Sequence, residues 1–239
     1  MATYEHCNAC GFVRASNPVW LNEAYSSAIA AADTGLVVRN ISIANKLASI
    51  LYWVLRERGE GKYLDAAGGY GMLARLMRDY GFDFYWADKY CDNLMARGFE
   101  YAKHPGKCRA ATAMEVMEHL IDPLAFVQQL FDETGIEYLI FSTELYEGTR
   151  PPSQDWWYYA FATGQHIGFF QRRTLEMLAQ HLGLHFASAG DLHLLSKVKI
   201  NEAYMSWVTG RWAGKVASAW SKRRLKSKTM LDHRQLLEN

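Results

Sequence analysis

The period of the hydrophobic pattern changes several times along the chain. Residues 41–58, "ISIANKLASILYWVLRER", carry apolar side chains at helical spacing and stop before a glycine, which predicts an amphipathic helix. Beyond residue 62, short apolar runs alternate with helical patterns. Strands are predicted within residues 62–67, 82–88, 108–115 and 137–145. Helices are predicted within residues 70–81, 123–134 and 174–183, the second opened by Asp122-Pro123 and the third capped by Thr174. This alternation predicts a doubly wound, mostly parallel α/β sheet.

The two ends of the chain depart from this alternation. Residues 184–197 read as strand, turn and strand, consistent with a hairpin or an antiparallel edge, and residues 201–239 read as helical and increasingly basic. The first 40 residues contain a tight CxxCG turn, a turn into a short helix at Asn17-Pro18, and the polar turn "DTGLVVRN". We therefore predict an N-terminal appendage over 1–40, a central domain over 41–200 and a basic helical tail over 201–239.

Composition limits the classes of protein that fit. The chain has 239 residues, half of them hydrophobic, and a formal net charge of +1, so it has material for a large core and no global field that favours nucleic acid or a membrane. No apolar run reaches the roughly 18 residues of a membrane span, and the N-terminus lacks a signal-peptide pattern. Four cysteines suit a reducing compartment. We expect a cytoplasmic protein.

The stretch "YLDAAGGYGMLARL" (63–76) places several small residues between a strand and a helix. In open α/β sheets ligands bind at this end of the strands, and the unpaired amides of the helix start face them. Asp88 ends the next strand, where an acid can accept hydrogen bonds from two ribose hydroxyls. These features fit a nucleoside ligand without choosing between a dinucleotide and S-adenosylmethionine. A tight turn with no ligand is the alternative, although it needs fewer small residues.

The next block narrows this choice. "ATAMEVMEHLIDPLAFVQQLF" (111–131) resembles the fourth-strand block of class I S-adenosylmethionine-dependent methyltransferases, and "LDAAGGYG" and "WAD" precede it in that superfamily's order. "WWYYAFATGQHIGFFQRRTLEMLAQHLG" (156–183) is similar to the methyltransferase-domain subgroup of type 23. The resemblance covers roughly residues 40–195 and implies a Rossmann-like fold and S-adenosylmethionine as cofactor. The same block speaks against an NAD-dependent oxidoreductase.

The resemblance also implies a set of cofactor-binding residues. Asp65, Ala67, Gly69 and Gly71 would line the methionine part of the cofactor with Gly68 in the same loop, Asp88 would hold the ribose, Lys89 and Tyr90 would flank adenine, and Met114 would lie beside the cofactor. Ala67 stands where the family motif has its first glycine. We therefore expect the turn to avoid a positive φ at that residue.

Candidate catalytic residues follow the fourth strand. Glu115, Glu118 and His119 lie within five residues, and the pattern resembles the metal-binding motif of ubiquinone-pathway O-methyltransferases and small-RNA 2′-O-methyltransferases, in which a further histidine, here His166, completes the site. A metal such as Mg²⁺, bound by these four residues, would polarise an acceptor hydroxyl. In the second interpretation His119 or His166 is a general base, with Glu115 beside it. In the third interpretation no metal binds: the acids cap a helix, and the histidine packs against neighbouring side chains.

Four consecutive aromatic residues, Trp156 to Tyr159, line a substrate pocket or form a lid packed on the domain. Cys7 and Cys10 make half of a zinc knuckle or a vestigial turn, and the sequence leaves their role open. The basic cluster over 222–228 fits RNA, anionic lipid or, more simply, a solvated helix face.

These observations predict a methyltransferase that acts on a hydroxyl of a small-molecule or sugar-containing acceptor. A metal-dependent RNA 2′-O-methyltransferase and a non-catalytic binding module with the same fold are the alternatives. Nucleic acid is the less favoured partner, no membrane span is predicted, and the sequence does not give the oligomeric state.

Overall fold

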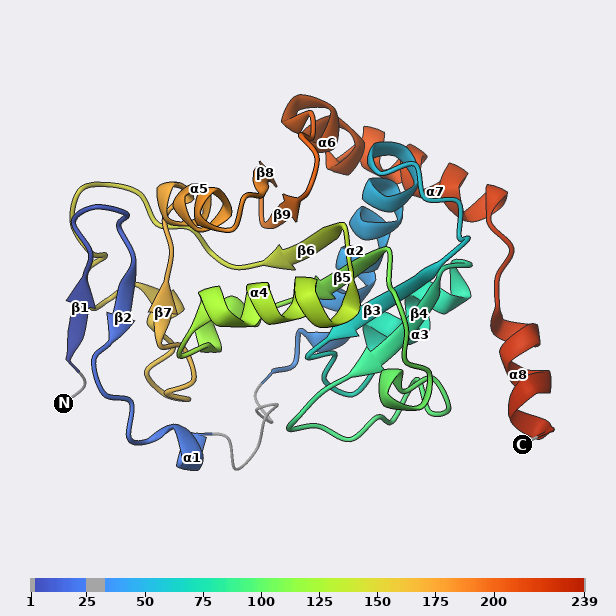
Figure 1. Ribbon diagram of the computed structural model, residues 1–239, viewed down its shortest axis with the longest axis horizontal. Coiled ribbons are helices and arrows are strands. Elements are labelled where there is room, and N and C mark those ends of the chain that lie inside the picture. Colours follow the sequence, from blue (N-terminus) through green and yellow to red (C-terminus); the bar gives the residue numbers. More distant parts are fainter. Residues whose placement is uncertain (1–2, 25–32, 239) are drawn as a thin grey trace.

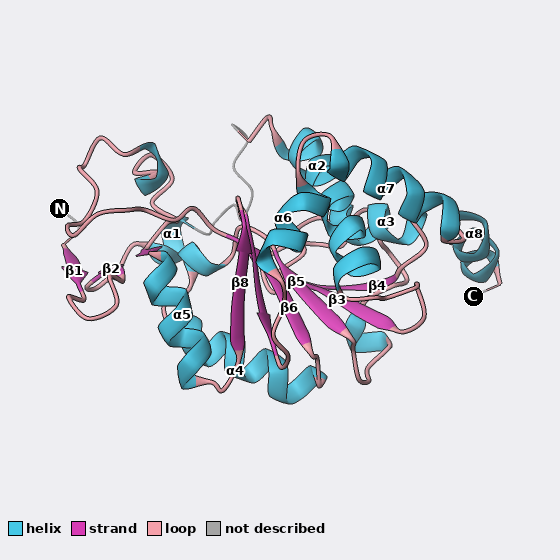
Figure 2. Cartoon of the chain, turned by 90° about the horizontal axis from the view of Figure 1, so that it is seen from above, coloured by secondary structure: helices cyan, strands magenta, loops and turns pink. Residues whose placement is uncertain are grey.

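Six strands form a central mixed sheet in the computed structural model, which describes residues 3–24 and 33–238 (Figures 1 and 2). In sheet order these strands are β4 (Asp83–Ala87), β3 (Lys62–Ala66), β5 (Ala110–Ala113), β6 (Tyr138–Ser142), β9 (Leu192–Ser196) and β8 (His185–Ala189). The first four are parallel, and β9 is antiparallel to both of its neighbours. The predicted α/β sheet is therefore confirmed. The predicted hairpin is formed by β8 and β9. The antiparallel strand β9 lies inside the sheet, and β8 lies at its edge.

Helices cover both faces of this sheet (Figure 2). One face carries α2 (Leu36–Ser49), which continues as the π-helical turn η1 (Ile50–Val54), together with α3 (Met72–Asp79), α6 (Glu202–Thr209) and α7 (Ala213–Arg224). The other face carries α4 (Pro123–Thr134) and α5 (Arg172–His181). The predicted helix over 41–58 thus begins five residues earlier, at Leu36, and its π-helical turn ends at Val54, before Gly59.

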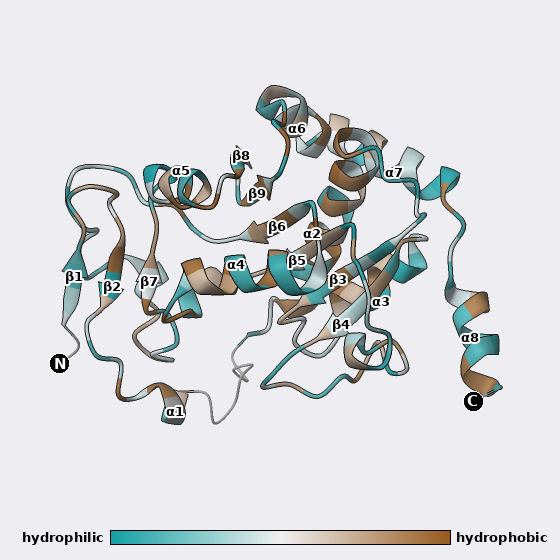
Figure 3. Ribbon diagram, in the orientation of Figure 1, coloured by the Kyte–Doolittle hydropathy of each residue, from teal (hydrophilic) through white to brown (hydrophobic). Residues whose placement is uncertain are grey.

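Each face of the sheet buries its own apolar cluster, and Figure 3 shows the hydrophobic residues concentrated in the central strands. Every residue of the inner parallel strands β5 and β6 is buried, as expected for a sheet covered on both sides. None of the described helices is both long and apolar enough to cross a lipid bilayer.

Helix caps decide where α4 and α5 begin. Asp122 caps α4 by accepting a hydrogen bond from Ala125 N at 2.9 Å, and Pro123 takes the first helical position, as predicted. The predicted cap at Thr174 of α5 is wrong. Gln171 is the N-cap residue, and Thr174 lies three positions later, where its hydroxyl accepts from Gln171 N at 3.0 Å in a capping box.

The N-terminal residues form a second, smaller sheet with a strand from the middle of the chain. Its strands are β1 (Tyr4–His6), β2 (Val13–Ala15) and β7 (Gly168–Phe169), and β2 pairs antiparallel with β7. The short helix α1 (Leu21–Ala24) follows at the predicted turn. Because β7 starts two residues after His166, this small sheet anchors the segment that carries that histidine.

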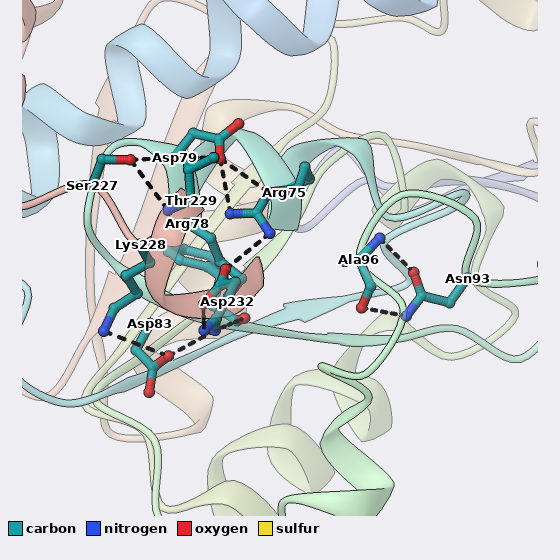
Figure 4. A network of polar contacts seen from close by, with 11 residues as sticks. Arg75, Arg78, Asp79, Asp83, Asn93, Ala96, Ser227, Lys228, Thr229 and Asp232 are labelled. Atoms are coloured by element: carbon teal, nitrogen blue, oxygen red, sulfur yellow. Dashed lines mark hydrogen bonds and ion pairs between the residues drawn. The ribbon is translucent and has the colours of Figure 1, made fainter. Parts of the chain in front are cut away.

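The C-terminal helix α8 (Thr229–Leu237) docks on α3 through a buried ion pair (Figure 4). Arg78 donates two hydrogen bonds to Asp232, at 2.7 and 2.8 Å, and the two side chains are 3% and 2% exposed. The Arg78 guanidinium also contacts Asp83 at 2.7 Å and lies 3.6 Å from the centre of the Phe99 ring. This contact fixes the end of the chain beside the edge strand β4.

Candidate active site

The glycine-rich loop leaves the carboxyl end of β3 and enters α3 through Gly71, which has a φ of +82°. Both backbone polar groups of Gly69 are bound by side chains of the neighbouring strand segment. Gly69 N donates to Asp88 Oδ2 at 2.9 Å, and Trp86 Nε1 donates to Gly69 O at 2.8 Å. The loop is therefore held in one conformation by the residues that end β4.

Ala67 contradicts the sequence-based expectation for its backbone. Its φ is +56°, in the left-handed region that the alanine was expected to avoid. A Cβ atom in that region is close to the following carbonyl oxygen and costs roughly 1–2 kcal/mol. The hydrogen bonds around Gly69 and the buried start of α3 impose the turn, so the local preference of alanine is overridden.

Position 68 has no room for a side chain, so it requires glycine. A Cβ atom at this position would lie 2.7 Å from Asp65 Oδ2 and 2.9 Å from Trp86 Cδ1. The loop backbone thus passes directly over the Asp65 carboxyl, which any larger residue at position 68 would prevent.

Asp65 is buried beneath this loop at the end of β3. Its Oδ1 accepts a hydrogen bond from Thr112 Oγ1 of β5 at 2.7 Å, while Oδ2 has no hydrogen-bond partner among residues 3–24 and 33–238. Burial raises the pKa of Asp65 to about 7, against the opposing effect of the Thr112 hydrogen bond. Buried acceptors without a partner are rare in proteins. Asp65 Oδ2 is such an acceptor, and it lies beside the loop.

Asp88 lies at the carboxyl end of β4 and is engaged by three amides. Its Oδ1 accepts from Tyr90 N at 2.7 Å and Cys91 N at 2.9 Å, in addition to the Gly69 contact of Oδ2. Lys89 beside it is exposed, with its Nζ 5.3 Å from the centre of the Tyr90 ring. Met114 lies after β5, partly buried against the α2–α3 core. The predicted cofactor residues therefore lie at the carboxyl ends of three adjacent strands.

The structure brings together three of the four predicted metal ligands. Glu118 and His119 lie on the turn η3 (Met117–His119) after β5, and one ligand atom each of Glu118, His119 and His166 lies within 4.8 Å of the others. His119 Nδ1 donates to Gln165 O at 3.0 Å, and His166 Nδ1 donates to Tyr158 O at 2.6 Å. These carbonyls fix the tautomer of each ring and place its lone pair on Nε2.

Burial and the charge of His166 lower the pKa of His119 to about 4. Its imidazole is therefore neutral near pH 7. Glu118 is fully buried, and its pKa is raised by that burial. Its Oε1 accepts from Tyr158 Oη at 2.6 Å, whereas Oε2 has no hydrogen-bond partner within the described part of the chain. Two carboxylate oxygens without partners, on Asp65 and Glu118, thus lie at the ends of neighbouring strands.

Glu115 does not join the group formed by Glu118 and the two histidines. Its φ is +55°, and Ser142 at the end of β6 holds it there: Glu115 N donates to Ser142 Oγ at 2.8 Å, and Ser142 Oγ donates to Glu115 Oε1 at 2.6 Å. Glu115 is exposed as a whole residue, but loss of solvent around its carboxyl and the charge of Glu118 raise the pKa of that carboxyl. The charge of Arg39 on α2 opposes this shift.

The four aromatic residues after the proline-rich turn differ in their surroundings. The turn η4 (Trp157–Tyr159) buries Tyr158 and Tyr159, which pack with Trp156 against Phe169 of β7. Trp157 is 71% exposed. Trp157 is therefore the member of this group that faces solvent, while Tyr158 contributes a polar group: its Oη also accepts from Glu144 N at 3.0 Å.

Cys7 and Cys10 lie in the tight turn between β1 and β2, and Gly11 N donates to Cys7 O at 2.8 Å. Hydrogen bonds from the backbone and side chain of Cys10 lower the pKa of the Cys7 thiol. In the described ranges no third histidine, cysteine or acid joins this pair as a potential metal ligand.

Sequence reasoning missed Trp86, Thr112, Ser142 and the hydroxyl of Tyr158 as site residues. The rule that ligands bind at the carboxyl ends of parallel strands, already applied to Asp65 and Asp88, could have identified the first three. Each of them lies at or near the carboxyl end of a strand in the parallel part of the sheet. Tyr158 gave no such signal, since its contact with Glu118 joins residues 40 positions apart.

The sheet order, the loop and the strand-end acids together define a Rossmann-like methyltransferase fold. A family model described as a methyltransferase domain, type 23, matches residues 42–189, and the chain belongs to this family. The matched residues form a methyltransferase domain. The chain spans 60% and 54% of the lengths of the first two solved structures that it resembles.

One solved structure, TnmH, shares this fold at low sequence identity. The crystal structure of TnmH is 19% identical with a TM-score of 0.51, and the match covers 75% of this chain and 60% of TnmH. CalO1, a methyltransferase of calicheamicin biosynthesis, is 10% identical with a TM-score of 0.46, covering 65% of this chain and 54% of CalO1. The magnesium protoporphyrin IX methyltransferase from Synechocystis PCC 6803 is 13% identical with a TM-score of 0.43, covering 76% and 93%. No curated protein matches the chain by sequence.

Proposed function

We propose that this protein transfers the methyl group of S-adenosylmethionine to a hydroxyl of a small-molecule or sugar-containing acceptor. The observation that carries the proposal is the convergence of two groups at one edge of the sheet. The glycine-rich loop with Asp65 follows β3, and Asp88 follows β4. Glu118 and His119 follow the neighbouring strand β5, and His166 lies beside them. A methyl donor and an acceptor must meet in line, and these adjacent strand ends bring their two sets of residues together.

The cofactor would bind across the glycine-rich loop. Gly69, Tyr90 and Cys91 use three of the roughly four lone-pair sites of the Asp88 carboxylate, and the remaining site on Oδ2 would accept from a ribose hydroxyl. Asp65 Oδ2, which accepts no hydrogen bond from the described residues, would accept from the ammonium group of the methionine part. That cation would favour the ionised form of the Asp65 carboxyl.

His166 is the proposed base for the acceptor hydroxyl. Its Nδ1 is committed to the Tyr158 carbonyl, so Nε2 carries the lone pair that can accept a proton. The lowered pKa of His119 makes that imidazole a weak base. We expect His166→Gln to reduce kcat much more than His119→Gln, with similar affinity of both variants for S-adenosylhomocysteine.

Calorimetric titration with S-adenosylhomocysteine tests the cofactor assignment. Asp88→Ala should abolish binding, and Asp92→Ala, an exposed acid of the same loop, should retain it. Absence of binding by the folded wild-type protein would refute the proposal. Acceptors would then be screened as pairs that differ in one hydroxyl, because an O-methyltransferase must lose all turnover with the deoxy partner.

A divalent metal is a second candidate, favoured by the distances within the group of Glu118, His119 and His166. The donor set fits: an acceptor oxygen without a partner on Glu118 lies beside two histidines whose Nδ1 atoms are held by backbone carbonyls, as in metal centres. A bound Mg²⁺ or related ion would polarise the acceptor hydroxyl, including a ribose 2′-hydroxyl of RNA. Titration with Mg²⁺ and Mn²⁺ should then give binding that Glu118→Gln removes, and an RNA with a 2′-deoxy terminus should not be methylated.

A further inference from the structure

The segment from residue 203 to residue 231 has an unusual charge. It contains no Asp or Glu and seven basic residues, giving a formal charge of +7, whereas the whole chain carries +1. The seven are Arg211, Lys215, Lys222, Arg223, Arg224, Lys226 and Lys228. Three of the eight tryptophans of the chain, Trp207, Trp212 and Trp220, lie in the same segment. Positive charge and indole rings are therefore concentrated on α6, α7 and the turn that follows.

Contacts with the rest of the protein fix which side of α7 faces outward. Ala217, Ser218 and Ser221 are buried, and Trp53 Nε1 of η1 donates to Ala217 O at 3.1 Å. Ser218 Oγ donates to Asn45 Oδ1 of α2 at 3.0 Å. Figures 1 and 2 both place α7 on the outside of the helical layer that includes α2. The opposite side of α7 is consequently turned to solvent.

That outer side presents a continuous apolar stripe. Trp212, Val216 and Trp220 recur at every fourth residue and are 77%, 70% and 46% exposed. Trp207 of α6 is 64% exposed, and Gly214 lets the start of α7 approach the end of α6, since a Cβ there would lie 2.9 Å from the backbone of Thr209. Large apolar side chains grouped in this way on a surface mark an interaction site.

Basic residues border the stripe without partners of their own. Arg211, Lys215, Arg223, Arg224 and Lys226 are exposed, and none of them forms an ion pair with another residue in the described ranges. Lys215 and Arg224 instead lie over indole rings, 5.8 Å from the centre of Trp212 and 5.1 Å from that of Trp220. Their charge is available to an anionic partner.

We propose that this surface, formed by Trp207, Trp212, Val216 and Trp220 with the five basic residues around them, binds the surface of an anionic lipid bilayer. Indole rings favour the boundary between headgroups and acyl chains, and an amphipathic helix with a basic border lies in that plane. The side of a helix is convex and can enter a flat interface, whereas single-stranded nucleic acid needs a charged groove to follow. The aliphatic side chain of Val216 at the centre of the stripe also suits lipid better than bases.

The test is binding of the full-length protein to extruded vesicles, followed by flotation and by the blue shift of tryptophan fluorescence. Phosphatidylcholine vesicles should bind weakly, and vesicles that also contain phosphatidylglycerol should bind well at low salt and less at high salt. Trp212→Ser should weaken this binding, and Lys215→Glu with Arg224→Glu should weaken it on the order of tenfold or more.

A charge-matched control separates a local surface from net charge. Lys107→Glu with Arg173→Glu changes the net charge equally at exposed positions beside α4 and on α5, on the other face of the sheet, and should leave vesicle binding intact. Thermal unfolding of each variant shows that it is folded. Equal loss in the control and in the test variant, or no vesicle binding by the wild type, would overturn the proposal. Binding of a single-stranded RNA under salt conditions where vesicles do not bind would assign the surface to nucleic acid instead.

Discussion

The hydroxyl of Tyr158 donates a hydrogen bond to Glu118 Oε1 at 2.6 Å, and both side chains are buried. The same tyrosine also positions His166, because its backbone carbonyl accepts a hydrogen bond from His166 Nδ1 at 2.6 Å. Tyr158 thus supports two members of the candidate catalytic group at once. Tyr158, identified from the sequence as an aromatic ring, therefore also contributes polar atoms to the site.

Tyr158→Phe should lower the rate of methyl transfer. Loss of the hydroxyl leaves the buried Glu118 carboxylate with less stabilisation, which costs roughly 1–3 kcal/mol and raises its pKa further. We expect kcat/KM to fall by about 5- to 150-fold and its pH profile to shift upward, with S-adenosylhomocysteine affinity unchanged. Tyr159→Phe is the matched control, since its hydroxyl donates to Pro152 O. Equal effects of the two variants would argue against a special role for Tyr158.

Ala67→Gly should stabilise the protein. Relief of the positive φ should stabilise the folded protein by roughly 1–2 kcal/mol. The greater freedom of glycine in the unfolded chain should destabilise the folded protein by about 0.5–1 kcal/mol. The free energy of unfolding in urea should therefore rise by about 1 kcal/mol or less. Ala66→Gly, in the buried end of β3 one residue earlier, should be destabilising. A decrease in stability for Ala67→Gly would show that its methyl group makes compensating contacts.

Asp65→Asn should change how stability depends on pH. The folded-state pKa of Asp65, about 7, is above the ordinary value near 3.9, so the folded protein binds a proton that the unfolded chain has released. This contribution to stability is complete below about pH 4 and declines as the pH rises to about 7. The asparagine variant should lose less stability between pH 4 and pH 7 than the wild type. Parallel curves from urea unfolding across this range would contradict the assignment.

Asp232→Asn should destabilise the docking of α8. Burial opposes ionisation of Asp232, but its hydrogen bonds with Arg78 and the charge of that residue outweigh burial and lower the pKa. The pair therefore stabilises the fold above about pH 4, and this contribution is lost as the pH falls through the lowered pKa of the folded state. Breaking a buried pair costs about 3–5 kcal/mol.

The control for this variant is Asp191→Asn, which breaks the exposed pair with Lys46 and should cost less than about 1 kcal/mol. Urea unfolding at pH 7 compares the two variants. Similar small losses for both would mean that the contact in Figure 4 contributes little to stability.

Local patterns in the sequence were sufficient for the elements of the parallel sheet and for the loop that follows β3. Hydrophobic periodicity, the Asp122-Pro123 helix start and the small residues after Asp65 act through neighbours in the chain, so their consequences can be read without a fold. The topological rule for open sheets then placed Asp65, Asp88 and Glu118 at one edge, because parallel strands end on the same side.

Only the tertiary structure decided the features that join distant segments. The positive φ of Ala67 is imposed by Asp88 and Trp86, the pairing of β2 with β7 ties the N-terminus to the segment of His166, and Asp232 meets Arg78 across 154 residues. Which tryptophans of α6 and α7 face solvent likewise depends on the contacts of α7 with α2. In each case the deciding energy comes from packing and hydrogen bonds between segments, and the preference of a single residue is too small to oppose them.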